Sequence, residues 1–192
     1  MKVSKCPSDA LTMTNRAIVN PGDFDKKVKK GYMQLIVHSK LIYIQTCPHI
    51  DVRTGPGQHF VFTVEPDAKV TQGTVAFSLP QRKWATLSLN QEIDVSPYQF
   101  NPDKHYLSSI VLEVDFFNKK NTSTDPFNSD DMAKEFSMQF CKQAFTVGMQ
   151  CVFNFQDKKL LQIIVKVSST VSRQRTTTIK LRQKCCKRLT HM

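Results

Sequence analysis

Apolar and polar residues alternate in short runs through the first half of the chain. The runs are QHFVFTVEP at 58–66, GTVAFSLP at 73–80, WATLSL at 84–89 and QEIDVSPY at 91–98, with Gly, Pro, Asp and Asn between them or at their ends. A period of two is what a strand needs when only one of its faces is buried. Short strands at this spacing predict a small β-barrel or sandwich, and ALTMTNRAIV at 10–19 alternates in the manner of one more short strand.

The second half of the chain combines strands with a helix. YLSSIVLEVDFF at 106–117 has a strand pattern and leads into a long polar loop. A helix follows, because three apolar side chains recur four apart and so share one face: Met132, Phe136 and Phe140. Ser129 or Asp130 can cap the start of this helix. Further on, MQCVFNF and LLQIIVKV flank QDKK, which predicts a hairpin.

These patterns predict a protein that is mainly β, of the α+β class, and that has two parts. The first part, about residues 1–97, is nearly all β, and the second, about residues 103–167, is a small α/β subdomain. The polar stretch FNPDKH separates them. Residues 168–192 have neither a clear period nor enough apolar residues for a core, so they are interpreted as a tail in which TTIKL is at best an edge strand.

The formal net charge of +11 is concentrated in two segments. Residues 167–192 hold seven Lys or Arg and no acid, and residues 28–45 hold three and no acid, so the rest of the chain is close to neutral. A basic balance of this size favours nucleic acid or an anionic membrane as the partner. A binder of that kind, driven by the tail, is therefore the alternative to a function carried by the folded parts.

No sequence motif for a reactive centre is present. The chain has no GxxxxGK[ST] loop to hold phosphates and no HExxH, GxSxG or DTG motif. The six cysteines form no CxxC pair and the five histidines show no ligand spacing, so we expect no metal and no other cofactor. The N-terminus lacks an apolar signal segment, and no apolar run is long enough to span a bilayer. We expect a cytoplasmic protein that is not an enzyme in this chain.

Recognition by surface charge remains as a function. The candidate residues are Lys5, Arg82, Lys83, Lys119 and Lys120. Four of them form two adjacent pairs, Arg82 with Lys83 and Lys119 with Lys120, and each pair follows the end of a strand-like run. Lys5 lies beside the turn CPSD. If the two parts pack together, these cations can line one cleft and meet an acidic partner, whereas the alternative is solvated loop charge. The only tryptophan, Trp84, is interpreted as an anchor between strands.

Several segments, in this order, resemble one family closely: KCPSDALTMTNRAIVN, GQHFVFTVEP, AFSLPQRKWATLSLNQEIDV, EVDFFNKKN and PFNSDDMAKEFSMQFCKQAFTVGMQCVFNFQDKKLL. They are similar to the N-terminal domain of the N-ethylmaleimide-sensitive fusion (NSF) proteins, the vesicle-fusing AAA+ ATPases, and to invertebrate members in particular. The resemblance covers about residues 2–24 and 50–166 without a break in order, and SLPQRKWA and DMAKEF are its most specific parts.

The resemblance implies a double-psi β-barrel over about residues 1–97 and an α/β subdomain from about residue 103, with a cleft between them. In that family the domain binds the soluble NSF attachment protein (SNAP) on SNARE complexes. Modules further along the family's chain use ATP and Mg, form the hexamer and disassemble the complexes, so we expect this chain alone to be a monomer without cofactor. The basic residues that meet the acidic adaptor fall here on Lys5, Arg82, Lys119 and Lys120, and Lys83 stands next to Arg82 at the cleft rim.

The chain departs from the family pattern in two places. VKKGYMQLIVHSKLIYIQ at 28–45 is an atypical insertion, which is explained either by translated intron sequence or by an added edge strand. After LLQIIVKV the family pattern stops, so the subdomain at 103–167 is incomplete at its C-terminal end and the ATPase modules are missing. We interpret the chain as a truncated isoform, a fragment or a faulty gene model with a divergent basic tail at 168–192.

Overall fold

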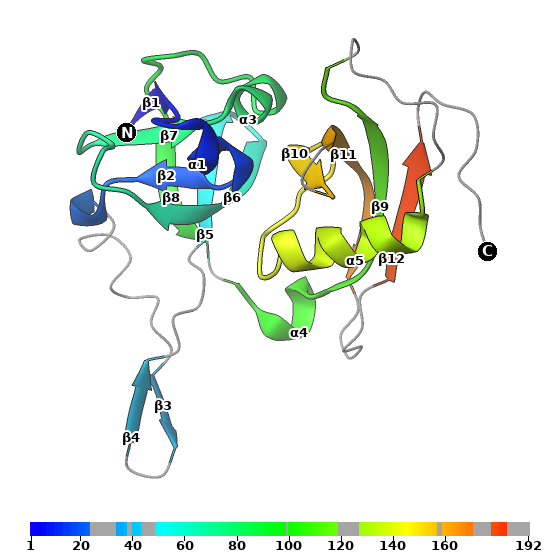
Figure 1. Ribbon diagram of the computed structural model, residues 1–192. Helices are drawn as coiled ribbons and strands as arrows, with labels where there is room; N and C mark the ends of the chain where they lie inside the picture. The colour runs from blue at the N-terminus through cyan, green and yellow to red at the C-terminus, as the bar shows by residue number, and fades with distance from the viewer. Residues whose placement is uncertain are drawn as a thin grey trace. The chain divides into compact units, whose positions relative to one another are not determined.

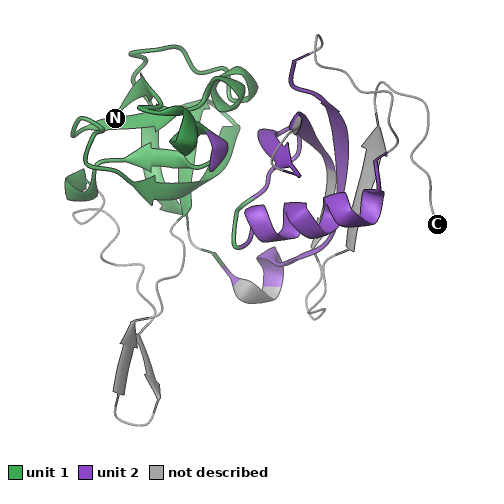
Figure 2. Ribbon diagram, viewed as in Figure 1, with its two compact units in different colours: residues 1–12, 16–100, 142–144 green, residues 13–15, 101–141, 145–192 purple. Residues whose placement is uncertain are grey.

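The computed structural model describes residues 1–23, 34–37, 40–43, 49–98, 100–118, 127–156, 159–170 and 178–183. The chain divides into two compact units, shown in Figures 1 and 2. The first unit comprises residues 1–12, 16–100 and 142–144, and the second comprises residues 13–15, 101–141 and 145–192. Each unit has its own β-sheet, and helices are few and short, which confirms the mainly β, α+β class predicted from the sequence.

A six-stranded sheet forms the first unit, in the order β1-β7-β2-β6-β5-β8. Its strands are β1 (Lys2–Lys5), β2 (Ala17–Val19), β5 (His49–Gly55), β6 (Gln58–Pro66), β7 (Thr74–Phe77) and β8 (Asp94–Tyr98). β1 and β7 are parallel, as are β2 and β6, whereas the other neighbouring pairs are antiparallel. Because parallel strands need long connections, most of this sheet is held by pairings between distant parts of the sequence.

The segment just before β8 joins the two ends of this sheet. The backbone N–H of Val3 donates to the carbonyl of Gln91, and the N–H of Ile93 donates to the carbonyl of Met1, both at 2.9 Å. Residues 91–93 run directly into β8, so the first strand of the sheet is connected to the last. The sheet therefore curls round on itself, and β1 is not left as an open edge.

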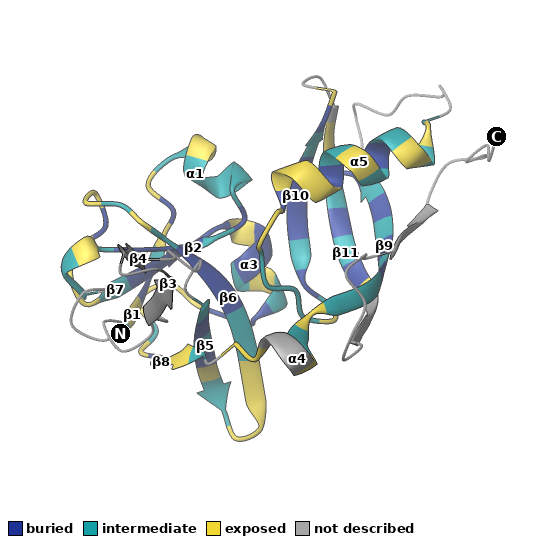
Figure 3. Cartoon of the chain, turned by 90° about the horizontal axis from the view of Figure 1, so that it is seen from below, coloured by how far each residue is buried: buried dark blue, intermediate teal, exposed yellow. Residues whose placement is uncertain are grey.

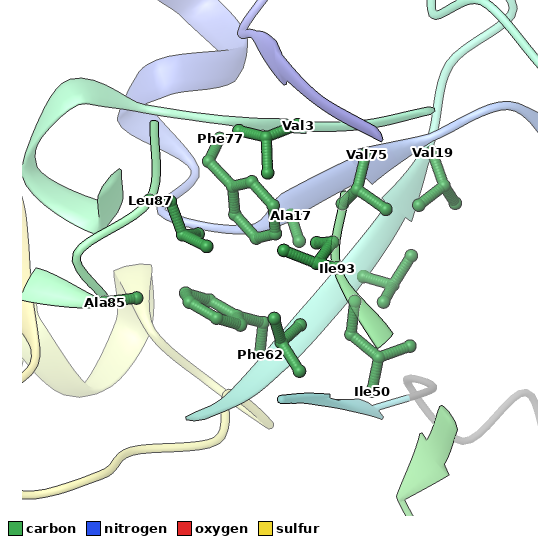
Figure 4. Packing of buried hydrophobic residues seen from close by; sticks show 12 residues of the cluster. Val3, Ala17, Val19, Ile50, Phe62, Val75, Phe77, Ala85, Leu87 and Ile93 are labelled. Carbon is green, nitrogen blue, oxygen red and sulfur yellow. The ribbon is translucent and has the colours of Figure 1, made fainter. Parts of the chain in front are cut away.

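Apolar side chains fill the interior of the curled sheet. Figure 4 shows Val3, Phe62, Phe77 and Ile93 converging from different segments, and the ring centroids of Phe62 and Phe77 are 4.9 Å apart. The other buried members of this core are Ala17, Val19, Ile50, Val52, Val64, Val75, Ala85 and Leu87. Full burial of one such Val, Leu, Ile or Phe side chain is worth roughly 1.5–3 kcal/mol, so this cluster is a major source of stability for the first unit.

Two runs that the sequence analysis interpreted as strands contain helices instead. ALTMTNRAIV divides into the short helix α1 (Asp9–Met13) and β2, and Asn15 between them has a φ of +54°. WATLSL is not a strand, because Trp84 is the last residue of the helix α3 (Leu79–Trp84) and the residues after it form a turn. Alternation of apolar and polar residues in so short a run does not distinguish a strand from a helix. The capping residues distinguish them, because they mark where a helix begins.

The second unit is a four-stranded sheet with a helix against one face (Figure 1). In the order β10-β11-β9-β12, its strands are β10 (Gln150–Phe155), β11 (Lys159–Thr170), β9 (Leu107–Phe116) and β12 (Thr178–Gln183). The predicted hairpin is confirmed by the antiparallel pair β10 and β11. The helix α4 (Pro102–His105) precedes β9, and burial alternates along the second half of β9, as Figure 3 shows.

The helix α5 (Ser129–Gln139) is capped by Asn128, not by Ser129 or Asp130 as expected. The Asn128 side-chain oxygen accepts the N–H groups of Asp130 at 2.8 Å and Asp131 at 3.4 Å. The predicted apolar face is confirmed, because Met132, Phe136 and Phe140 are all buried. The rings of Phe136 and Phe140 lie 6.0 and 6.2 Å from that of Phe153 on β10, so aromatic contacts fix this helix on the sheet.

The two atypical segments are each described in part. Within 28–45, β3 (Gln34–Val37) and β4 (Lys40–Tyr43) pair with each other in an antiparallel sheet of their own. The expectation of an added edge strand is therefore wrong for the described part of this segment, and the intron hypothesis stays a prediction. In the tail, β12 pairs in parallel with β9 at the edge of the second sheet, with Thr178 opposite Ser109.

Candidate functional site

Helix α3 carries two of the predicted site residues, Arg82 and Lys83, in its last turn. Its start is fixed by a capping box, in which Gln81 N–H donates to the Ser78 hydroxyl at 3.4 Å and Ser78 N–H donates to the Gln81 side-chain oxygen at 2.8 Å. Pro80 sits in the first turn, where its missing N–H costs nothing. Arg82 and Lys83 are therefore on a helix, and not on the turn between two strands that the sequence analysis expected.

The buried face of α3 packs against the barrel. The Trp84 ring meets Phe60 and Phe62 of β6 edge to face, with centroids 5.1 and 5.4 Å apart. Pro80 and Gln81 are buried on the same side. Trp84 is therefore an anchor between a helix and a strand, and not between two strands as predicted. Its ring contacts give the short helix a defined orientation, which its own length would not provide.

The two cations of α3 differ in their exposure. Lys83 is exposed, and Arg82 is half-buried. Within the part of the chain that the structure describes, neither side chain forms an ion pair, and Nε of Arg82 is buried without a hydrogen-bond partner. A buried donor without a partner costs roughly 1–3 kcal/mol. Because Nε has almost no surface open to solvent, an acidic partner would bind Arg82 through the other N–H groups of its guanidinium.

Lys5 lies at the same end of the sheet as α3. It is the last residue of β1, is exposed, and pairs in register with Phe77, the last residue of β7. Because β1 and β7 are parallel, their carboxyl ends lie side by side, and α3 begins two residues after Phe77. The structure thus brings Lys5 and the α3 cations to one end of the β1 and β7 pair.

Two of the predicted site residues, Lys119 and Lys120, lie outside the described residues. They follow β9, which belongs to the second unit. The predicted cleft that joins all five cations therefore stays a prediction. We name the part of the site that the structure brings together, formed by Lys5, Arg82 and Lys83, the basic surface of the first unit.

One exposed residue beside these cations was missed by the sequence analysis. Leu79, the first residue of α3, leaves 51% of its surface exposed. The signal that would have found it is the capping box at Ser78 and Gln81, since a helix beginning at residue 79 places Leu79 three and four residues before Arg82 and Lys83.

Proteins of similar sequence come from nematode and yeasts, whereas no family model matches the chain. The chain is 40% identical over 170 residues to the vesicle-fusing ATPase of Caenorhabditis elegans. It is 31% identical over 169 residues to vesicular-fusion protein sec18 of Schizosaccharomyces pombe, and 26% identical over 159 residues to vesicular-fusion protein SEC18 of Saccharomyces cerevisiae. These alignments cover 86%, 87% and 81% of the chain.

The chain belongs to the vesicle-fusing ATPase family. It spans about 18% of the length of each of these three relatives, so it corresponds to one region of much longer proteins. This agrees with the resemblance to the N-terminal domain of the family that the sequence analysis identified.

The described residues include no group of three or more His, Cys, Asp or Glu side chains that could hold a metal ion. Cys151 is buried in the second unit, and this burial raises the pKa of its thiol to about 12. A thiol with so high a pKa is a poor nucleophile. Among the helices in the described parts, none is long and apolar enough to cross a membrane.

Proposed function

We propose that this chain is the adaptor-binding module of a vesicle-fusing ATPase and that it recognises soluble NSF attachment protein on SNARE complexes. The observation that carries the proposal is the similarity to vesicle-fusing ATPases over 86% of the chain, together with the free cations of α3. In this proposal the module works at the cytoplasmic side of vesicle fusion and protein transport, and meets membranes only through its partners.

Electrostatic complementarity is the proposed basis of recognition. Arg82 offers a planar guanidinium that can bind a carboxylate through two N–H groups, whereas Lys5 and Lys83 act as point charges. Exposed charges of this kind speed up association and select an acidic partner more than they add affinity. They are screened over about 8 Å at physiological ionic strength, so the binding should weaken as salt is added.

The module is proposed to be non-catalytic. The chain has no GxxxxGK[ST] sequence, which is the loop that cradles nucleotide phosphates in P-loop ATPases. The matched region makes up only about 18% of the length of the vesicle-fusing ATPase and of the sec18 protein, so most of each relative lies outside it. ATP, Mg and the hexamer are assigned in this proposal to regions of the family outside the matched part.

The test is binding of the purified chain to SNAP assembled on a SNARE bundle. We expect Arg82→Glu to weaken binding about tenfold at low salt and by less at high salt. Lys69→Glu is the matched control, because Lys69 is an exposed cation of the same unit. Lys69 comes before the start of β7, whereas α3 follows the end of β7. Equal effects of the two reversals would contradict the proposed site.

A second function is favoured by one observation, the seven Lys or Arg and no acid within residues 167–192. A binder of anionic nucleic acid or membrane would use these charges. Deleting the whole tail would also remove β12, which pairs with β9, so the discriminating deletion is residues 184–192. This function predicts that the deletion reduces binding to anionic vesicles or DNA, whereas the adaptor-binding function predicts unchanged SNAP binding.

A further inference from the structure

Helix α3 has two distinct faces. Pro80, Gln81 and Trp84 form the face that packs on the barrel. Residues three and four apart share a helix face, so Leu79, Arg82 and Lys83 form the opposite face. On that outward face the leucine lies between the two cations, since Arg82 and Lys83 flank the line along the helix that starts at Leu79.

Packing of the barrel does not account for a leucine at this position. Leu79 is 51% exposed and is not part of the core cluster of the first unit. A single exposed leucine is common on protein surfaces and by itself indicates nothing. Leu79 differs in its setting, because it stands one turn from an arginine whose Nε has no partner and from an exposed lysine, on a helix held by its cap and its tryptophan.

A second exposed leucine lies near the same end of the sheet. Leu89 is 50% exposed and belongs to the loop between α3 and β8. The N–H of Asn90 donates to the carbonyl of Val3 at 2.9 Å, which holds this loop beside β1, two residues before Lys5. Apolar surface and positive charge therefore alternate over α3 and the carboxyl end of β1.

We propose that Leu79 is a contact residue for the same partner as the basic surface of the first unit. The part of the partner that binds here is an acidic surface of the attachment protein in which an apolar side chain adjoins a carboxylate. The apolar side chain covers Leu79, and the carboxylate reaches Arg82 or Lys83. This inference rests on the proposed function and adds a specificity determinant to it. Charge alone would accept any acidic partner, whereas the central leucine selects those with an apolar group at the right place.

The energetic roles of the two kinds of contact differ in their response to salt. Interfaces commonly have an apolar centre surrounded by a polar rim, and the rim excludes water from the centre. Burial of Leu79 is not screened by salt, whereas the attraction of Arg82 and Lys83 is screened. Removal of the Leu79 side chain should therefore weaken binding by the same factor at low and at high ionic strength.

The experiment measures binding of the full chain to SNAP on a SNARE bundle at about 0.05 M and about 0.5 M salt, which changes the Debye length about threefold. Burial of the exposed half of a leucine predicts about fivefold weaker binding for Leu79→Ser at both salt concentrations. Leu79→Met, which keeps an apolar side chain of similar volume, should bind within about twofold of the wild type. Met138→Ser is the matched control, because Met138 is 70% exposed on helix α5.

The outcomes separate the inference from the proposed function. A fivefold, salt-independent loss for Leu79→Ser with no change for Met138→Ser supports both. If Arg82→Glu weakens binding and Leu79→Ser binds like the wild type, the inference is overturned while the proposed function stands. If Leu79→Ser and Leu79→Met lose affinity equally, shape at the helix start and not apolar contact is responsible, which also overturns it. Absence of binding by the folded wild-type chain overturns both.

Discussion

Replacement of Ser78 by alanine tests whether the capping box holds α3 in place. The Ser78 hydroxyl accepts the Gln81 N–H, and both residues are buried. Loss of a serine N-cap costs about 0.5–2 kcal/mol. The distance of 3.4 Å is long for such a bond, which lowers the expected loss, whereas burial of the N–H raises it, so we expect about 1 kcal/mol.

Removal of the other half of the box should cost more. The Gln81 side-chain oxygen accepts the Ser78 N–H at 2.8 Å, and Gln81→Ala leaves that buried N–H without a partner, which costs roughly 1–3 kcal/mol before the loss of side-chain packing is added. The double variant should lose less than the sum of the two single losses, because both bonds belong to one structure.

The assay is urea unfolding followed by the fluorescence of Trp84. It is the only tryptophan in the chain and packs from α3 onto β6, so its emission reports the unfolding of the first unit. Ser88→Ala is the control, because Ser88 is exposed and its backbone, not its side chain, makes the bond to Gln91. We expect this control to stay within about 0.5 kcal/mol of the wild type. An equal stability of the Ser78 and Ser88 variants, or a smaller loss for Gln81→Ala than for Ser78→Ala, would refute the reasoning.

Three further predictions concern groups away from α3. Burial lowers the pKa of His49 below 6.5, so this side chain takes up a proton more readily in the unfolded chain than in the folded one. The free energy of unfolding should therefore fall as the pH drops below 6.5, and His49 should add no pH dependence above it. In a pH series of unfolding free energies, His49→Gln should flatten the part below pH 6.5. A thiol reagent at pH 8 should label Cys141, which is exposed, in the folded chain, and should label Cys151 only after unfolding. The Cys151 thiol is buried and its pKa is about 12, so it is neither accessible nor ionised in the folded chain. Mass spectrometry of peptides measures the order of labelling, and labelling of Cys151 in the folded chain would contradict this prediction. The side-chain amide of buried Asn15 donates to the Val152 carbonyl at 2.6 Å and accepts the Val152 N–H at 2.7 Å. Asn15→Ala should therefore destabilise the second unit by about 2–4 kcal/mol, measured by circular-dichroism unfolding. A loss below about 0.5 kcal/mol would show that other groups replace these bonds.

The sequence predicted the elements whose pattern is long and local. Met132, Phe136 and Phe140 recur over more than two turns, so the apolar face of α5 could be derived from their spacing alone. The same holds for the hairpin of β10 and β11, where two apolar runs flank a short polar turn. The fold class followed from the number of such strands and the single clear helix.

The errors lie where a short run fits two structures. WATLSL alternates like a strand, yet the capping box that begins at Ser78, six residues before Trp84, had already started a helix that includes Trp84. At Asn15, a positive φ ends the α1 segment, and nothing in the spacing of ALTMTNRAIV reveals it. The resemblance to the family supplied Arg82 as a site residue. Its position on one face of α3 could not be predicted, because residues 79–84 were not expected to be helical.

The neighbourhood of the basic surface could not be predicted from local sequence. Lys5 and Phe77 are brought together by a parallel pairing of strands that are about seventy residues apart, and such pairings leave no local signal. The exposure of Leu79 likewise depends on how Trp84 orients the helix. Charge could be counted from the sequence, but its placement beside apolar surface required the fold.

The measurement that tests the central claim most directly is the affinity of this chain for SNAP on a SNARE bundle at low salt, with Arg82→Glu and Lys69→Glu measured beside the wild type. The account predicts binding by the wild type and by Lys69→Glu, and about tenfold weaker binding by Arg82→Glu, with all three chains equally folded by Trp84 fluorescence. Equal binding by all three folded chains, or none by the wild type, would contradict the claim that the cations of α3 form an adaptor-binding surface.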